Sequence, residues 1–299
     1  MDLGFNYQSS HTTSGTKSRT GLDHGLQSGS RISFRGTEDL GNGLKASFVI
    51  EYGIAPDLNE TLGVGGGATN RQSFLALSGD FGTVAAGRQY TPQFSMLARM
   101  DPFGAAGIAR VGSTYEWDSR LDNTLAYVSP NFDGLNVTVA HSFNAAGTEV
   151  AKNAGNGKVW AVSPRYTNGP IDVQLNWHRI KSDLSGSDAT KVWDLGGSYD
   201  FGAVKAVAII GTRKTSDVQD KRYYLLGATA PVGDAGTFKI SYVAQRDKEP
   251  SPTYKERAWN IGYDHRLSAR TNVYTAFSKR SQDFTGYKSQ FNVGLRHMF

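Results

Sequence analysis

Eight consecutive residues, Ile171-Asp172-Val173-Gln174-Leu175-Asn176-Trp177-His178, decide how this chain folds. Every odd position is apolar and every even position is polar. A β-strand produces this pattern because successive side chains point to opposite faces. The stretch therefore predicts a strand with one apolar face and one polar face.

The same period of two recurs along the chain, at 135–139, 238–242, 259–264 and 291–299. A comparable helical period is present only around Gln93 to Met100, where we expect one short helix. The chain is therefore predicted to be all-β.

Turn signals divide the chain regularly. Seven tight connections rich in Gly, Asp, Asn and Pro lie at 39–43, 78–82, 130–134, 168–170, 200–202, 232–236 and 267–270. Eight longer polar connections lie at 10–27, 54–69, 90–119, 144–156, 182–190, 212–221, 247–255 and 280–288. The two kinds alternate strictly, and these fifteen connections join sixteen strands.

Composition narrows the class of protein. The chain has 299 residues, 38% of them hydrophobic, and a mean hydropathy of −0.42. No stretch reaches the roughly 18 to 20 apolar residues of a membrane helix. The absence of cysteine excludes disulfides, thiolate catalysis and cysteine zinc sites. The net charge of +5 comes from 32 basic and 27 acidic residues interleaved along the chain, which argues against nucleic-acid binding.

Short turns at one end and long loops at the other are typical of an outer-membrane barrel. We therefore predict one domain, residues 1–299: a transmembrane, 16-stranded antiparallel β-barrel with short periplasmic turns and long extracellular loops. So wide a barrel leaves an aqueous channel. The alternative is a soluble protein of two packed sheets, which would also show alternation. Residues 1–7 have neither a basic nor an apolar signal region, so we expect no signal peptide within the chain.

Several segments resemble one known family, the trimeric general-diffusion porins of Gram-negative bacteria, and most closely their betaproteobacterial and neisserial type. The matching segments are 29–46, which contains Arg35-Gly36-Thr37-Glu38-Asp39-Leu40-Gly41, and 70–74, 81–89, 122–132 and 294–299. The resemblance implies a passive channel for small hydrophilic solutes and ions in the bacterial outer membrane. It also implies a homotrimer in contact with outer-membrane lipids and lipopolysaccharide, and no cofactor.

The resemblance also implies a pore constriction. Loop 90–119 matches the family's third loop, which folds into the barrel, and its acidic candidates are Asp101, Glu116 and Asp118. Arg31, Arg88 and Arg120 match an arginine ladder on the facing wall. Alternation independently turns Arg31 inward, because Ile32 and Phe34 take the lipid face.

Two further arginines need comment. Alternation through Phe74 also turns Arg71 inward. Strict alternation from Val84 points Arg88 outward. Arg88 lies at the start of the third loop, however, where the alternation need not continue. For each arginine, the alternative is an exposed rim charge or an ion-pair partner. Because arginines outnumber well-placed acids, we expect a preference for anions.

The chain ends carry two further expectations. By resemblance, Phe299 with the aromatic His297 two positions earlier is an assembly signal read by the barrel assembly machinery. Phe299 also extends the lipid-facing stripe of the last strand. Members of the family begin with more residues of strand one, so we expect a shortened seam between the first and last strands.

Enzyme motifs are weak. The glycine run at 63–67 lacks a following Gly-Lys-Ser/Thr, and the six histidines show no metal-ligand spacing. We therefore expect no catalytic residue, metal or cofactor. The alternatives to a channel are a surface adhesin or receptor, or an outer-membrane hydrolase.

Overall fold

A computed structural model describes residues 1–12, 15–58, 71–107, 115, 118–145, 157–182, 186–249, 253–283 and 286–299. This described part contains seventeen strands and one α-helix. No described helix has the length and hydropathy of a membrane-spanning helix.

The elements follow one another along the chain. The first strands are β1 (Asp2–Thr12), β2 (Gly15–His24), β3 (Arg31–Gly41), β4 (Leu44–Gly53), β5 (Gln72–Gly79) and β6 (Gly82–Tyr90). The helix α1 (Pro92–Met100) comes next. The remaining strands are β7 (Arg120–Val128), β8 (Leu135–Ser142), β9 (Gly157–Asn168), β10 (Ile171–Ser182), β11 (Thr190–Asp200), β12 (Lys205–Thr215), β13 (Gln219–Val232), β14 (Gly236–Asp247), β15 (Tyr254–Arg266), β16 (Thr271–Gln282) and β17 (Gly286–His297).

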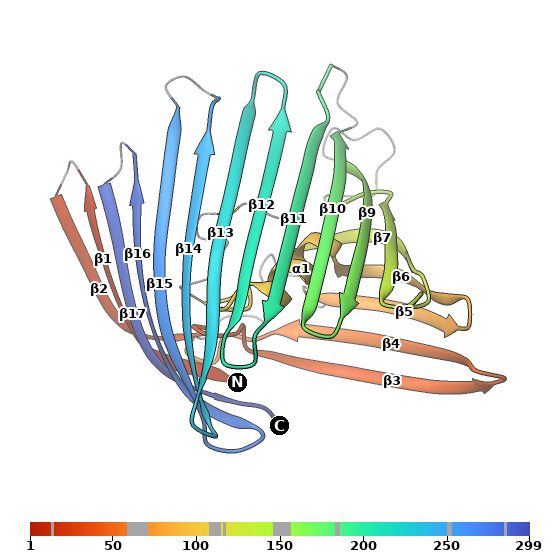
Figure 1. Cartoon of the computed structure of the whole chain (residues 1–299), viewed down its shortest axis with the longest axis horizontal. Coiled ribbons are helices and arrows are strands. Elements are labelled where there is room, and N and C mark those ends of the chain that lie inside the picture. Colours follow the sequence, from red (N-terminus) through yellow and green to blue (C-terminus); the bar gives the residue numbers. More distant parts are fainter. Residues whose placement is uncertain are drawn as a thin grey trace.

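The strands form one deeply curved antiparallel sheet with α1 on its concave side (Figure 1). Neighbouring strands from β3 to β17 pair in sequence order, and β1 pairs with both β17 and β2. The predicted antiparallel barrel architecture is confirmed. Within the described residues no ladder joins β2 to β3, so the barrel has an open seam at this place.

The first long connection differs from the prediction. Most of segment 10–27, expected as a loop, extends β1 and forms β2, which raises the strand count from sixteen to seventeen. β2 is polar and mostly exposed on both faces, so hydropathic alternation could not reveal it. It supplies hydrogen-bond partners to an edge of β1 that would otherwise be unpaired. The strands likewise extend into segment 212–221, leaving residues 216–218 between β12 and β13.

The seam between the first and last strands is not shortened. β1 and β17 pair over ten residue pairs, from Asp2 opposite Arg296 to His11 opposite Tyr287. The N-terminal ammonium donates a hydrogen bond to the carbonyl oxygen of His297 at 2.9 Å, which ties the two chain ends together. The expectation of a short seam is therefore wrong, and the opening lies one strand further along.

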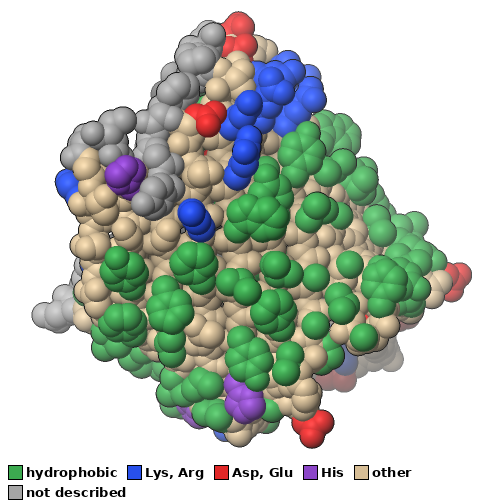
Figure 2. Space-filling model, turned by 60° about the vertical axis from the view of Figure 1, so that its left-hand side comes forward, with side chains coloured by type: hydrophobic (Ala, Val, Ile, Leu, Met, Phe, Trp, Pro, Cys, Tyr) green, Lys and Arg blue, Asp and Glu red, His purple; other side chains and the backbone are tan. Residues whose placement is uncertain are grey.

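The sheet has two chemically different faces. Large apolar side chains such as Leu75, Leu226 and Trp259 are exposed on the outer face. Figure 2 shows a broad band of hydrophobic side chains across one side of this surface. Inward-facing positions carry buried polar residues, including Asn176, Asp194 and Asn260. A lipid-facing outer surface and a polar interior follow from the period-two pattern.

The apolar core lies inside the barrel, between the third loop and one wall. It consists of Met96, Leu97, Met100, Ala105 and Tyr115 of the loop with Val207, Ile209, Tyr223, Leu225, Val243 and Ala258 of strands β12 to β15. The loop is thus fastened to one side of the barrel by burial of apolar surface.

Inward-facing glycines make room for the loop. A Cβ atom at Gly196 would lie 2.7 Å from Met100 Sδ, and one at Gly227 would lie 2.6 Å from Pro102 Cγ. At Gly262 a Cβ atom would lie 2.7 Å from Phe103 Cε1, and at Gly211 it would clash with the Tyr115 hydroxyl. These four positions on β11, β12, β13 and β15 form a glycine track on which the third loop lies.

The glycine track leads to a prediction about channel size. Replacing Gly196 with Phe should push α1 off the wall and change the single-channel conductance, because Met96 and Met100 occupy the space that the ring needs. Gly197→Phe is the matched control, since a Cβ atom there meets only Val173 Cγ2, at 3.9 Å. Equal conductance changes in both variants, measured in planar bilayers, would refute the role of the track.

Candidate functional site: an arginine cluster in the barrel lumen

The helix α1 places the third loop across the lumen. Thr91 caps its N-terminus by accepting a hydrogen bond from the Phe94 N–H at 3.0 Å, and Pro92 follows at the first helical position. Met96, Leu97 and Met100 turn to the wall, while Ser95 and Arg99 line a cavity on the other side. The predicted helix around Gln93 to Met100 is confirmed.

The cavity has a volume of about 410 Å³ and lies between α1 and strands β5 to β10. On the strands its lining combines apolar residues such as Phe74 and Val128 with the polar residues Gln72, Gln89, Asn136, Thr138, Ser163, Arg165 and Gln174. The third loop therefore leaves an open space with polar groups on the side of the barrel away from its apolar attachment.

An arginine cluster surrounds Glu51 on β4, whose side chain is 1% exposed. Arg71 Nε lies 2.6 Å from Glu51 Oε1, Arg35 lies 3.4 Å from Oε2, and Arg31 lies 3.8 Å from Oε1. Ser33 donates a further hydrogen bond to Oε2 at 2.9 Å. One carboxylate thus faces three guanidiniums.

Tyr90 connects a fourth arginine to this cluster. Its hydroxyl oxygen accepts hydrogen bonds from Arg71 at 3.0 Å and from Arg120 at 3.1 Å. The Arg120 guanidinium also lies over the Tyr90 ring, 4.6 Å from its centre. This part of the wall therefore has an excess of positive charge, with four guanidiniums, those of Arg31, Arg35, Arg71 and Arg120, and the one carboxylate of Glu51.

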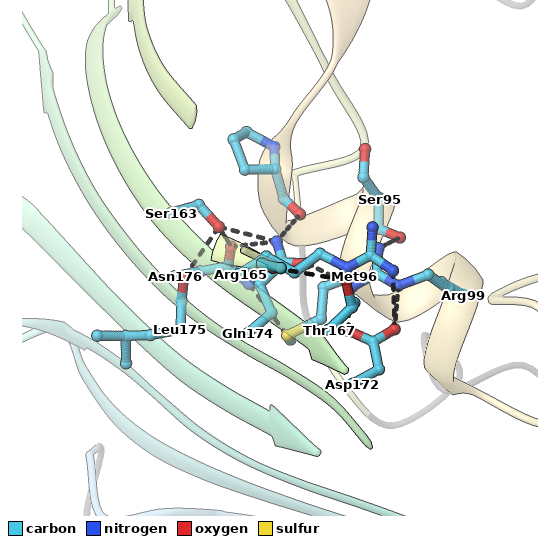
Figure 3. Close-up of polar contacts among 12 residues, drawn as sticks. Ser95, Met96, Arg99, Ser163, Arg165, Thr167, Asp172, Gln174, Leu175 and Asn176 are labelled. Carbon is cyan, nitrogen blue, oxygen red and sulfur yellow. Dashed lines mark hydrogen bonds and ion pairs between the residues drawn. The ribbon is translucent and has the colours of Figure 1, made fainter. Parts of the chain in front are cut away.

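A second polar cluster joins α1 to the wall strands β9 and β10 (Figure 3). Asp172 is held by Arg99 at 2.7 Å and by Arg165 at 2.9 Å. Arg99 also donates a hydrogen bond of 2.5 Å to Gln174. Two guanidiniums again face one carboxylate, at the edge of the cavity.

The structure brings together three of the four predicted arginines, Arg31, Arg71 and Arg120. Arg88 lies apart from them. It stands opposite Ser73 in the sheet. Because the neighbours of Ser73, Gln72 and Phe74, line the cavity, Ser73 and Arg88 lie on the other face of the sheet. Its guanidinium lies 2.5 Å from Asp122. Arg88 therefore points outward, as strict alternation along the strand predicts. The structure does not support the expectation that Arg88 lines the constriction.

The predicted acids lie away from the arginine cluster. Asp101 is buried at the C-terminus of α1, where its carboxylate accepts hydrogen bonds from the Phe103 N–H at 3.2 Å and the Ala105 N–H at 3.0 Å. Asp118 pairs with Arg213 at 3.0 Å. Glu116 lies outside the described residues. Asp101 thus stabilises its own turn, and Glu51 takes the place expected for a loop acid.

Buried hydrogen bonds fix the rest of the loop. The Tyr115 hydroxyl donates to Asp194 on β11, and Gln93 donates to the other carboxylate oxygen at 2.8 Å. Burial, together with the nearby Asp194 carboxylate, raises the pKa of Tyr115 well above its ordinary value, so the hydroxyl remains a donor.

Alternation also turns Arg35 inward, although it was not among the predicted constriction residues. The residues with no prediction from the sequence are Glu51, Tyr90, Arg99, Arg165 and Asp172. Glu51 had one usable signal, since it is the acid at the end of the otherwise apolar run Phe48-Val49-Ile50. The other residues look like ordinary strand or helix polar positions.

The side chain of the last residue is exposed. Phe299 follows the end of β17 and is 91% exposed. Its ring lies 4.9 Å from that of His297, whose Nδ1 lies 2.9 Å from the Thr271 hydroxyl.

A sheet with an apolar outer face, a polar lumen and an internal loop beside a cluster of arginines defines an outer-membrane channel. The sequence model of the Gram-negative porin family matches residues 1–285, and the chain belongs to that family. It is therefore a porin of the bacterial outer membrane.

Three relatives place the chain within the family. Outer membrane porin protein 32 of Delftia acidovorans is 33% identical over 316 residues, which cover 94% of this chain and 88% of the relative. Major outer membrane protein P.IA of Neisseria meningitidis is 35% identical over 331 residues, covering 91% and 81%. The solved structure of the anion-selective porin from Comamonas acidovorans is 28% identical, has a TM-score of 0.82, and covers 100% of this chain and 99% of its own.

Proposed function

We propose that this porin is a passive diffusion channel that prefers anions among small hydrophilic solutes. The observation that carries the proposal is the arginine cluster. Arg31, Arg35 and Arg71 surround the Glu51 carboxylate, and Arg120 joins them through the Tyr90 hydroxyl. Fixed guanidiniums at a wet lumen wall lower the energy of an entering anion and raise that of a cation. The similarity to an anion-selective porin supports the same preference.

The pore-lining set in this proposal is Arg31, Arg71 and Arg120 of the sequence prediction, with Arg35 and Glu51 added from the structure. The Arg99 and Arg165 pair extends the positive charge along the cavity. We propose that the whole chain acts as one barrel domain and works as a homotrimer; an outer membrane protein of Vibrio cholerae with the same fold is known in a trimer form.

Planar-bilayer recording tests the channel directly. The refolded protein should give stable conductance that closes in three steps, and the unheated protein should migrate on a denaturing gel as a trimer. A surface adhesin or receptor barrel would bind its target without such conductance. Hydrolysis of lipid or peptide without conductance would identify an enzyme and overturn the proposal.

We further propose that Phe299 and His297 form the signal by which the assembly machinery of the outer membrane recognises β17. Phe299 is exposed and contributes little packing, which leaves it available for recognition. The outer surface would then meet outer-membrane lipids and lipopolysaccharide.

Deleting Phe299 tests this assignment. Because the ring is 91% exposed, the purified and refolded variant should keep its thermal stability. Insertion into outer membranes in cells should fall several-fold. Replacing Phe132, an exposed aromatic residue in the short turn between β7 and β8, with Ala is the matched control. An equal loss of refolded stability and cellular insertion would show that Phe299 is merely structural.

A further inference from the structure

The connection between β2 and β3, residues 25–30, leaves the sheet and enters the lumen. Its backbone meets the third loop, because a Cβ atom at Gly107 would clash with the carbonyl oxygen of Leu26. It also meets the arginine cluster, because a Cβ atom at Gly29 would lie 3.2 Å from a guanidinium nitrogen of Arg71. We call residues 25–30 the inner segment. It bridges the third loop and the charged wall.

The inner segment holds Arg31. The Arg31 Nε donates a hydrogen bond to the Gly29 carbonyl oxygen at 3.0 Å, and Nη2 donates another to the Ser28 hydroxyl oxygen at 2.6 Å. The Glu51 carboxylate is farther from Arg31, at 3.8 Å, which is too long for a hydrogen bond. The inner segment, rather than Glu51, therefore fixes the position of this guanidinium.

Asp2 attaches the inner segment to the barrel wall. Its side chain is buried, and one carboxylate oxygen accepts hydrogen bonds from the Gln27 N–H at 2.8 Å and the Ser28 N–H at 2.6 Å. The other oxygen accepts a hydrogen bond from the Tyr274 hydroxyl on β16. The Asp2 N–H donates to the Ser30 hydroxyl oxygen at 2.9 Å. Because hydrogen bonds to a charged group are the strong ones, the carboxylate is the main attachment.

We propose that Asp2 is a positioning residue for ion selectivity: through the inner segment, it keeps the Arg31 guanidinium turned to the lumen and away from Glu51. The inference deepens the proposed anion preference and rests on it. Asp2 is too deeply buried to meet a passing ion itself. When the inner segment is released, Arg31 loses both acceptors and closes the gap to Glu51, since a carboxylate accepts a stronger hydrogen bond.

The charge of Asp2 and its hydrogen bonds predict opposite results. Asp2→Asn removes the charge, but the amide oxygen still accepts from the Gln27 and Ser28 N–H groups, and the amide nitrogen donates to the Tyr274 hydroxyl. The anion preference should then stay the same or rise slightly. Asp2→Ala removes the charge together with these hydrogen bonds. Because Arg31 then moves by a few ångströms, the permeability ratio of chloride to potassium should fall about twofold.

Reversal potentials of the refolded full chain in planar bilayers measure this ratio. A double variant separates positioning of Arg31 from a general structural loss. In an Arg31→Gln background, Asp2→Ala should no longer lower the ratio, because no guanidinium is left to move. Equal shifts in Asp2→Asn and Asp2→Ala, or an undiminished fall in the Arg31→Gln background, would overturn the inference. A cation-selective wild type would contradict the proposed function instead, and the two Asp2 variants would still test the positioning role.

Gly107→Ala displaces the inner segment from the loop side and serves if Asp2→Ala does not fold. The added Cβ atom would clash with Leu26, so the ratio should again fall about twofold. Gly104→Ala is the matched control. Gly104 has nearly the same φ as Gly107, 65° against 67°, and the nearest atom to a Cβ there is the Ala98 carbonyl oxygen at 3.8 Å. Gly104→Ala should keep the wild-type ratio, and equal ratios in the two glycine variants would also overturn the inference.

Discussion

Replacing Arg120 with Glu should reverse or abolish the anion preference of the channel. The guanidinium is held at the lumen wall by Tyr90, so a carboxylate there changes the local charge by two units. At about 7 Å in a partly aqueous lumen, each unit changes the energy of a passing ion by roughly 0.5 to 1 kcal/mol. The shift has opposite sign for chloride and potassium, so the permeability ratio of chloride to potassium should fall by more than about tenfold at low salt. Reversal potentials across a KCl gradient measure it.

A matched control separates local from global charge. Arg270→Glu makes the same change at an exposed turn between β15 and β16, and it should leave the reversal potential unchanged. Similar shifts in both variants would mean that the net charge of the protein, rather than the arginine cluster, sets selectivity. Arg31→Glu should behave as Arg120→Glu does, with little effect on folding.

Replacing Glu51 with Gln should lower the stability of the barrel and strengthen its anion preference. The side chain is 1% exposed and holds Arg71 at 2.6 Å, so the neutral amide leaves the guanidiniums to repel each other. Breaking a fully buried pair costs about 3 to 5 kcal/mol, and solvent access to Arg31 and Arg35 reduces the expected loss to about 2 kcal/mol. Denaturant unfolding of the refolded barrel measures this loss.

Glu38→Gln on the neighbouring strand is the control for Glu51, because Glu38 is exposed and should tolerate the change. A Glu51→Gln protein that is as stable as the wild type would show that Glu51 does not hold the arginines in place. An unchanged or weaker anion preference would show that they do not act on ions in the lumen.

The fold was predictable because each strand of the barrel wall separates lipid from water. Apolar and polar residues therefore alternate along β10, β14, β15 and β17. Short turns lie at one end of the barrel and long loops at the other. β2 escaped prediction because both its faces meet water and its sequence therefore has no period. Its pairing with β1 is a consequence of an available edge rather than of residue type.

The site was predictable in part. Arg31 could be turned inward from its apolar neighbours Ile32 and Phe34, and Arg120 could be placed from its resemblance to an arginine ladder. The alternation argument for Arg71 was wrong, because Phe74 lines the lumen cavity and does not face lipid. Glu51, the partner of Arg31 and Arg71, depends on the register of β3, β4 and β5, which brings residues twenty positions apart into contact. The bond from Arg99 to Asp172 spans 73 positions and exists only because α1 folds into the barrel. Neither contact has a local signal.

The most direct measurement of the central claim is the reversal potential of the wild-type channel in a planar bilayer separating dilute from concentrated KCl. The arginine cluster at Glu51 predicts a potential of the sign given by chloride-selective flow, with a magnitude that falls as the overall salt concentration rises. A potential of the opposite sign, showing potassium selectivity, would contradict it.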